Sequence, residues 1–334
     1  MGNVSAGLEL HVGKEATNAW GTAVAPTAKL MGVNGFSITP LIDVRQLTDE
    51  LQGTMQPAYR EIIGNISAEA TLEGILSFED APYLFDMMFH HTSTDAYMTT
   101  DASCDAVRSY DAPIESSDIE DPRVMTFVYG DGTYVWGFNG GTARTLTLSA
   151  APGEPVTYSL DMFGKNVTSD TLAALSDRSV DFVMSHHGTI TIDLDSNAIG
   201  TSTDVIDAFS AELTINSNRV PKYHIGDQTP NGWQDHPWDG TLALTIEMSS
   251  NADDYIDAIV GATTIGVKRN VRMKFLSDSD YVQIDFGGIV LDQPEIFEDA
   301  DGVISMTLNL QSHKTEGLTS WLECEIVNHV PALT

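Results

Sequence analysis

Apolar and polar residues alternate with a period of two along most of this chain, and this pattern constrains its fold more than any other feature. Residues 66–73 place Ile, Ala and Leu at one set of alternate positions and Ser, Glu and Thr at the other. Successive side chains of a strand point to opposite faces, so this segment is predicted to be a strand with one buried and one solvated face. Further segments of this kind are 145–149, 156–162, 189–194, 213–215, 242–248, 282–286 and 303–310. We therefore predict a mostly β protein with antiparallel pairing.

Two short helices are predicted within this β pattern. The first covers residues 80–89, where acidic residues and Pro82 lie in the first turn and an apolar stripe follows. The second covers residues 252–260, where Asn251 is a favoured N-cap residue and Gly261 fits the position after the last turn. Each predicted helix follows an alternating strand after a similar number of residues.

The order of these elements repeats once along the chain. Strand, long loop, strand, helix, loop and β-hairpin occur in the first half and again in the second, as expected for an internal duplication. We predict an N-terminal arm at 1–34 and two β-sandwich or barrel units at 35–170 and 171–334, each with one short helix. The polar, acidic residues 92–123 depart from the repeat and are expected to form an insertion or surface loop.

Two long connections, residues 41–64 and 216–240, each join strands that are expected to pair. Connections of this length inside a compact β domain are usually functional. We therefore expect both loops to make contacts outside their own unit.

The chain is strongly acidic throughout. Its 334 residues carry 48 Asp and Glu against 16 Lys and Arg, a formal net charge of −32, and both halves contribute almost equally. Such a chain has no basic face for phosphates, which excludes DNA binding by counterion release. Hydrophobic residues still make up 42% of the chain, enough for ordered cores.

Acidic, lysine-poor surfaces also suit concentrated salt. At about 1 M salt the Debye length is about 3 Å, so repulsion between the acids is screened. We therefore expect a halophilic source and a melting temperature that rises between low and molar salt. The sequence shows no transmembrane segment and no secretory leader, so we expect synthesis in the cytoplasm, with Cys104 and Cys324 as separate reduced thiols.

The run from Glu15 to Thr27, EATNAWGTAVAPT, resembles the N-terminal signature of the tail tube proteins of long-tailed bacteriophages and archaeal tailed viruses. The strand and loop that begin at Phe209, followed by Trp238-Asp239-Gly240-Thr241, resemble the second half of that family. The resemblance covers most of the chain, and the acidic segment 92–123 and the extreme charge depart from it.

This resemblance implies rings, typically hexameric, that stack into the hollow tube of a virion tail through which viral DNA passes. The implied partners are further copies of the chain and other tail proteins, such as the tape measure and the ring proteins of the tail ends. Viral DNA would pass through without specific binding, because an acidic wall repels phosphate.

Site residues follow from the resemblance together with the strand pattern. Acids on the solvent faces of equivalent strands are candidates for the lumen: Glu69, Glu73, Asp161 and Glu247. The alternative interpretation is that these acids are ordinary solvated residues of the outer wall. The two long loops and the arm 1–34 would bridge successive rings, with aromatic residues as contact candidates: Trp20, Tyr59, Trp233 and Trp238.

Motifs for metal binding and catalysis are weak or missing. Asp193, Asp195 and Asn197 match the first positions of a calcium loop, but Ala198 stands where the loop needs Gly and Asp204 where it needs Glu, which favours a polar turn. The adjacent pairs His90-His91 and His186-His187 are expected to diverge, and the loop with His224, Asp227, Asp235, His236 and Asp239 lacks the fixed spacing of a zinc site.

The sequence shows no phosphate loop, no nucleophile elbow and no H-E-x-x-H motif. We therefore expect no cofactor, no metal and no enzymatic activity. Two other interpretations stay open: an acidic β-sandwich that binds to or decorates a virion or cell surface with the help of cations, and a hydrolase on a β scaffold.

Overall fold

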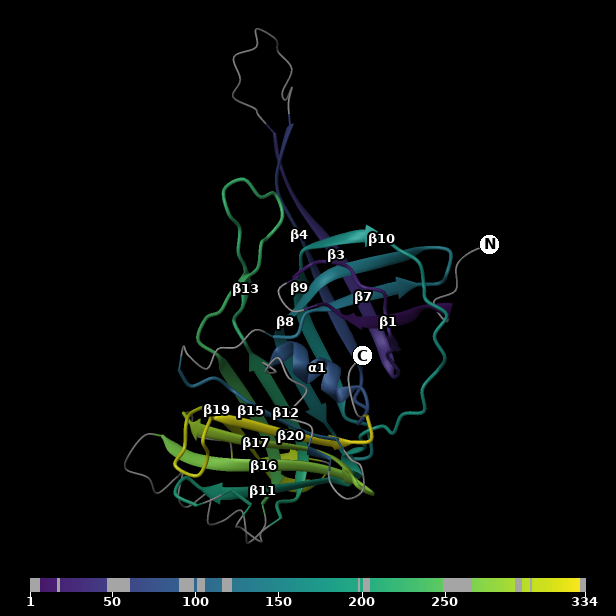
Figure 1. The fold of residues 1–334 in the computed structure, drawn as a ribbon. Coiled ribbons are helices and arrows are strands. Elements are labelled where there is room, and N and C mark those ends of the chain that lie inside the picture. Colours follow the sequence, from purple (N-terminus) through teal and green to yellow (C-terminus); the bar gives the residue numbers. More distant parts are fainter. Residues whose placement is uncertain are drawn as a thin grey trace.

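The computed structural model describes residues 7–16, 19–46, 61–89, 99–100, 106–115, 122–197, 199–200, 205–248, 266–291, 296–300 and 302–330. Strands dominate these residues, which confirms the mostly β class (Figure 1). The strands of the first half are β1 Glu9–Lys14, β2 Ala28–Lys29, β3 Val33–Gln46, β4 Glu61–Ile75, β5 Thr99–Thr100, β6 Ala106–Asp111, β7 Met125–Gly130, β8 Val135–Ala150, β9 Thr157–Gly164 and β10 Asn166–Ser169. Those of the second half are β11 Gly188–Leu194, β12 Ala208–Asn216, β13 Val220–Pro221, β14 Trp233–Gln234, β15 Asp239–Glu247, β16 Val267–Ser277, β17 Asp280–Val290, β18 Ile296–Ala300, β19 Val303–Ser312 and β20 Leu322–Asn328.

Each segment predicted from alternation lies in a strand, to within one residue at its ends. The predicted first helix is present as α1, Ala81–Met88, and a 3₁₀ turn, η3, covers Ser185–His187. The second predicted helix, 252–260, lies outside the described residues. Local patterns therefore identify the elements well.

One antiparallel sheet runs through both halves of the chain. Its strands pair in the order β3, β4, β9, β8, β12, β15, β19. The pairing of β8 with β12, from Thr145 opposite Asn216 to Ala150 opposite Ala211, joins the first half to the second. One face of this central sheet is apolar and buried, with contributions from Leu72, Leu160, Leu146, Leu213, Leu244 and Leu308.

A further layer of strands covers the apolar face in each half. In the first half this layer is β2, β1, β7, the beginning of β8, and β10. In the second half it is β11, β16, β17, β20 and β6. Strand β8 belongs to two layers: residues 135–141 pair with β7, and residues 142–149 pair with β9. Gly140, with φ +76°, supplies the left-handed backbone conformation where β8 changes layers.

The two halves use the same succession of strand pairs. In the first half β1 pairs with β7, β7 with β8, β8 with β9 and β10, β9 with β4, and β4 with β3. In the second half β11 pairs with β16, β16 with β17, β17 with β19 and β20, β19 with β15, and β15 with β12.

Helix α1 lies buried between the central sheet and the strands of the second half (Figure 1). Phe85 and Phe89 stack on each other and both pack against Tyr110 of β6. At the end of the helix the buried guanidinium of Arg219 donates to the carbonyl oxygen of Met88 at 2.8 Å, which satisfies a terminal acceptor and complements the helix dipole. The second half therefore supplies the cap of the helix in the first.

Strands lie in two segments for which the sequence predicts an arm and an insertion. Residues 9–14 of the expected N-terminal arm form β1, and Leu10 and Val12 are buried in the core. Residues 106–111 of the expected insertion form β6, which pairs with β20 and buries Arg108 and Tyr110. The sequence around β6 is polar, and the partner strand β20 lies more than two hundred residues further along the chain. The sequence alone therefore does not indicate this strand.

Candidate assembly surfaces

The solvated face of the central sheet is lined mainly by hydroxyl and amide side chains. Cross-strand partners point to the same face of a sheet. One row of partners crosses six strands and contains a single carboxylate: Glu73, Ser159, Thr147, Thr214, Thr241 and Gln311. Hydroxyls of neighbouring strands contact each other across the row, with Thr147 Oγ1 3.2 Å from Thr214 Oγ1. We call this surface the hydroxyl face.

The four acids predicted for the lumen all lie on the hydroxyl face. Strand register places Glu69, Glu73 and Asp161 on it in the first half and Glu247, opposite Ser305, in the second. Glu69 and Asp161 come together around one cation, because Arg144 Nη2 lies 3.0 Å from Glu69 Oε1 and Nη1 lies 3.2 Å from Asp161 Oδ2. Partial burial raises the pKa of Asp161, and the positive charge of Arg144 opposes that shift.

Arg144 was missed by the sequence interpretation, because it interrupts the alternation of β8. It is the extra residue of a β-bulge between Ala143 and Thr145, which turns its side chain toward Asp161. Arg144 could have been identified as the one basic residue at a break in the alternation of β8, next to strands that carry acids on their solvated face. The hydroxyl face is consequently less negative than its acids alone suggest.

A two-stranded ribbon extends from one end of the central sheet (Figure 1). Strand β9 ends at Gly164, opposite Ala68, whereas β3 and β4 pair with each other as far as Gln46 and Glu61. The predicted loop 41–64 is therefore strand at both of its ends, and residues 47–60 lie outside the described part of the chain. Six strand residues, 41–46, reach about 20 Å.

The ribbon exposes large apolar side chains. Leu41, Ile42, Val44, Ile62 and Ile63 are between 38% and 55% exposed. Ile42 and Val44 lie on one face with Ile63, the cross-strand partner of Val44. The other face carries Arg45, which is paired with Asp43 at 2.9 Å. A projecting apolar strand pair is a template for association with another chain.

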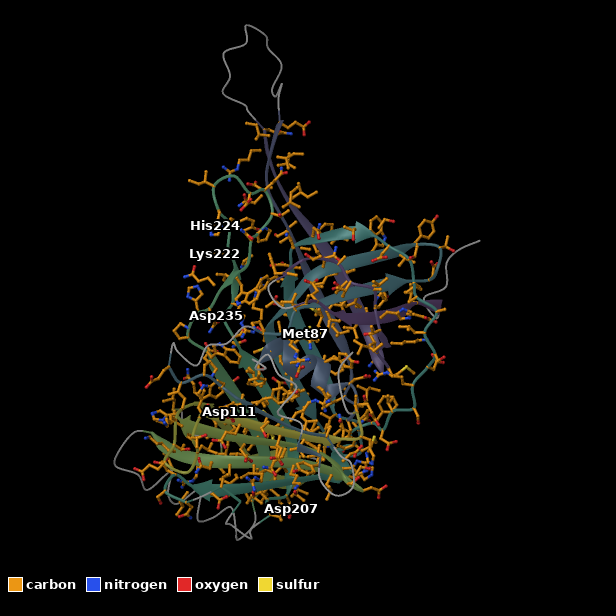
Figure 2. The ribbon with its side chains drawn as sticks, in the orientation of Figure 1. Met87, Asp111, Asp207, Lys222, His224 and Asp235 are labelled. Atoms are coloured by element: carbon orange, nitrogen blue, oxygen red, sulfur yellow. The ribbon has the colours of Figure 1, made fainter. Side chains whose placement is uncertain are left out.

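The second predicted loop, 216–240, lies beside the ribbon and contains the short pair β13 and β14. Its carbonyl at Gln228 accepts a hydrogen bond of 2.8 Å from the backbone N–H of Ile66 on β4. Ile225 at its tip is fully exposed, and Lys222 and His224 lie in the same projection (Figure 2). Both long connections thus reach the same end of the molecule.

The aromatic contact candidates divide between the surface and the interior. Trp233 is half-buried on β14, and its ring lies 6.2 Å from that of Trp20. The indole N–H of Trp20 donates to the carbonyl of Gly140 at 3.0 Å. Trp238 is partly buried and packs against Phe89, with the Arg219 guanidinium 4.9 Å from its ring. Tyr59 lies outside the described residues.

The segment that begins at Glu15 stabilises the bend of β8. The buried carboxylate of Glu15 accepts hydrogen bonds from the N–H of Gly140 at 2.7 Å, the N–H of Gly21 at 2.6 Å and the hydroxyl of Thr126 at 2.8 Å. Glu15, Trp20 and Gly21 therefore hold together the chain start and the turn at Gly140. Each buried donor left without its acceptor would cost about 1–3 kcal/mol.

Burial gives the molecule an unusual pH dependence. It raises the pKa of Glu15 above its ordinary value of 4.5, and burial likewise raises those of Glu79 and Asp80. The folded state therefore holds these protons more tightly than the unfolded state, so stability falls as pH rises through the raised values. We expect the melting temperature to increase as the pH is lowered from neutrality toward 4.5, the ordinary pKa of a Glu carboxyl, with a smaller increase in Glu15→Gln. A melting temperature that falls steadily over this range would contradict the assignment.

The carboxylates of the calcium-like turn accept hydrogen bonds from backbone N–H groups, one in the turn and one in a distant segment. Asp193 Oδ2 accepts from the N–H of Gly200 at 2.8 Å, and Asp195 Oδ1 accepts from the N–H of Glu316 at 2.9 Å. This arrangement supports the polar-turn interpretation. Ala198 and Asp204 lie outside the described residues.

The other metal candidates are also engaged in structure. Asp235 pairs with Arg219 at 2.8 Å, and Asp239 accepts from the side chains of Asn216 and Asn218. His186 and His187 lie in η3 with ring centroids 4.3 Å apart, so the expectation that they diverge in a strand is wrong. Over the described residues no group of three His, Cys, Asp or Glu is arranged to hold a metal ion.

Cys324 is a buried free thiol whose pKa is raised by burial, and Cys104 lies outside the described residues. Among the helices of the described residues, none is long and apolar enough to cross a membrane.

Comparison with known proteins gives one family match. The family model described as phage tail tube protein matches residues 5–311. A comparison with curated proteins finds no match.

Proposed function

Because this chain belongs to the phage tail tube protein family, which makes it a structural protein of the virion tail, we propose that it assembles into stacked rings that form a hollow tube. The central sheet is the observation that carries this proposal. It buries one face and presents a hydroxyl-lined face to solvent, and β3 at its edge pairs, among the described strands, on one side only. Pairing of such an edge with the next copy would close a ring and protect the edge from aggregation.

We further propose that each chain contains two copies of one tube unit, at residues 35–170 and 171–334. The support is the shared succession of strand pairs: β3–β4–β9–β8 in the first half corresponds to β12–β15–β19–β17 in the second. The hydroxyl face then repeats within each subunit, and hexameric rings are one symmetry that such units can form. The remaining partners on this proposal are the tape measure protein and the ring proteins of the tail ends.

The hydroxyl face is proposed to line the lumen, with Glu69, Glu73, Asp161 and Glu247 among its residues. Hydroxyl and amide groups bind water and carry no net charge, and Arg144 is held between two acids. Such a wall has no row of cations that could displace counterions from the DNA phosphates. DNA would therefore pass through without adhering.

The acidic surface is proposed to suit concentrated salt. A net charge of −32 costs stability through self-repulsion, and molar salt screens that repulsion. We expect the melting temperature to rise by about 5 °C or more between roughly 0.05 M and 2 M potassium chloride, which corresponds to about 3.5 kcal/mol for a chain of this size. Potassium chloride serves better here than sulfate, which strengthens apolar burial by itself. An unchanged or lower melting temperature would remove the salt proposal and leave the tube proposal standing.

Electron microscopy of the purified chain tests the tube proposal. Rings or hollow tubes in molar salt are the expected result. A discrete monomer at all salt and protein concentrations would count against self-assembly.

A further inference from the structure

The central sheet alternates in strand direction from one edge to the other. Its strands pair antiparallel in the order β3, β4, β9, β8, β12, β15, β19 and β18, and each half of the chain supplies four of them. Among the described strands, β3 pairs only with β4 and β18 only with β19. Strands β3 and β18 run in opposite directions, so a second copy placed at either edge continues the antiparallel order.

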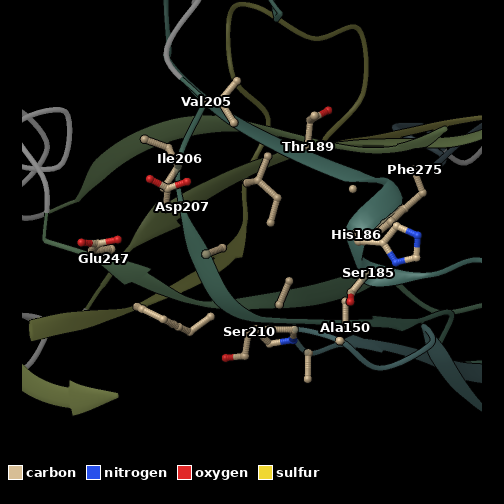
Figure 3. A pocket seen from close by; sticks show the side chains of 18 residues that line it. Ala150, Ser185, His186, Thr189, Val205, Ile206, Asp207, Ser210, Glu247 and Phe275 are labelled. Atoms are coloured by element: carbon tan, nitrogen blue, oxygen red, sulfur yellow. The ribbon is translucent and has the colours of Figure 1, made fainter. Parts of the chain in front are cut away.

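The contact between β8 and β12 joins the two halves of one chain in the same way. Strand β8 ends the first half's share of the sheet, and β12 begins the second half's share. Their pairing runs from Thr145 opposite Asn216 to Ala150 opposite Ala211, and Thr145 Oγ1 donates to Asn216 Oδ1 at 2.9 Å. Figure 3 shows one end of this contact, where Ala150 and Ser210 line the same cavity of about 460 Å³. The internal contact is therefore a template for a contact between chains.

Matching bulges align β3 with β12. The pairing of β3 with β4 skips Asn34, and the pairing of β12 with β15 skips Phe209. Leu41 follows the first bulge residue by seven positions, and Asn216 follows the second by the same number. Leu41 therefore has the place in β3 that Asn216 has in β12.

A pair of glycines aligns β8 with β17. Gly140-Gly141 and Gly287-Gly288 lie where each strand reaches the central sheet, through β9 in the first half and β19 in the second. Thr145 follows the first pair by four positions, one of which is the bulge residue Arg144, and Leu291 follows the second pair by three. Leu291 therefore has the place after β17 that Thr145 has in β8.

The two aligned positions at the free edges are exposed leucines. Leu41 is 38% exposed and Leu291 is 51% exposed. If one chain met the next in the register of the internal contact, these two side chains would lie opposite each other and cover each other. Pro40 has no N–H, so it removes at most one hydrogen bond from such a ladder and makes the free edge less prone to other pairings.

We propose that β18 and Leu291 of one chain pair with β3 of the next chain in the same ring, with Leu291 opposite Leu41. Each contact between chains then repeats the contact between the two halves of a chain. A ring consequently contains half as many chains as tube units, and three chains complete a ring of six units. This inference rests on the proposed function and replaces one chain per unit by one chain for every two units.

Cysteine cross-linking measures both the register and the number of chains. Leu41→Cys and Leu291→Cys are combined in a Cys104→Ser background, and tubes assembled in molar salt are oxidised. Residues directly opposite each other in antiparallel strands have Cα atoms about 4.5–5.5 Å apart, within reach of a disulfide. A non-reducing gel should show a ladder that ends at three linked chains. The control uses Ser37→Cys in place of Leu41→Cys, about 13 Å away along β3, and should give no ladder.

The outcomes separate the strand pairing from the function on which it rests. Tubes that form without a ladder overturn the pairing of Leu41 with Leu291 and leave the tube proposal standing. A ladder that continues to six chains overturns the count of two units per chain in one ring. Failure of the unsubstituted chain to form tubes overturns the tube proposal as well.

An exchange of side chains gives an independent measurement on the same contact. Leu41→Asn and Leu291→Thr should each raise the protein concentration needed for assembly about fivefold, because each removes one side of an apolar cross-strand pair. Together they reproduce the internal pair of Asn216 and Thr145, so assembly should return to within about twofold of the unmodified chain. Leu41→Asn with Leu276→Thr, at a similarly exposed residue of β16, is the matched control and should stay impaired. Equal impairment of the two double variants would overturn the direct pairing.

Discussion

Replacing Ile42, Val44 and Ile63 together with threonine is expected to prevent tube formation while leaving the subunit folded. Each side chain is about half exposed, so covering the remainder contributes roughly 1 kcal/mol, or about 3 kcal/mol for the three. Loss of that contribution raises the concentration needed for assembly at least about a hundredfold. Threonine keeps the β-branched shape that suits a strand, so the ribbon itself should persist. Sedimentation of polymer over a concentration series measures the effect.

A matched variant carries threonine at Leu194 and Leu276, two similarly exposed apolar positions on the layer of β11, β16, β17, β20 and β6, here called the outer sheet. It should assemble like the unmodified chain. Near-ultraviolet circular dichroism and melting temperature verify that both variants fold. If the triple variant forms tubes at the normal concentration, the ribbon is not the contact between rings.

Introducing lysine at Thr71, Thr147 and Thr214 is expected to convert a passive lumen into one that retains DNA. These positions lie on the hydroxyl face of three different strands, and every subunit of a ring would repeat them. Contacts with 6–10 phosphates would make the affinity fall by about 10³–10⁵ between 50 and 200 mM salt. Tubes are assembled with short duplex DNA in molar salt, washed at salt concentrations down to about 50 mM and treated with nuclease, and the retained and protected DNA is measured at each concentration.

Position-matched lysines on the outer sheet provide the control for this variant. Leu194 on β11 and Leu276 on β16 are about half exposed and lie away from the central sheet, and lysines there should bind DNA that nuclease still digests. Unmodified tubes should retain no DNA. If DNA is protected from nuclease in the outer-sheet variant but not in the hydroxyl-face variant, the outer sheet lines the lumen instead.

Local pattern predicts the elements of this fold because alternation is a property of each strand alone. Residues 66–73 and 242–248 could be assigned to strands without knowing their partners, and α1 was indicated by its proline and apolar stripe. The solvated positions Glu69, Glu73 and Glu247 were likewise assigned to one face by periodicity.

Pairing between distant segments could not be predicted in the same way. The strand at 106–111 is recognisable only beside β20, and the bulge at Arg144 changes which residues share a face. Ile42, Val44 and Ile62 lay in a segment interpreted as a loop, although they belong to the paired ends of β3 and β4 and are about half exposed. The assembly surfaces were therefore the least predictable part of the sequence.

Cryo-electron microscopy of the tube assembled in molar salt tests the central claim most directly. The account predicts that Ser159, Thr147 and Thr214 face the lumen and that the ribbon of each copy enters the next ring. A map with this row of residues on the outer wall, or with rings joined by surfaces other than the ribbon, would contradict it.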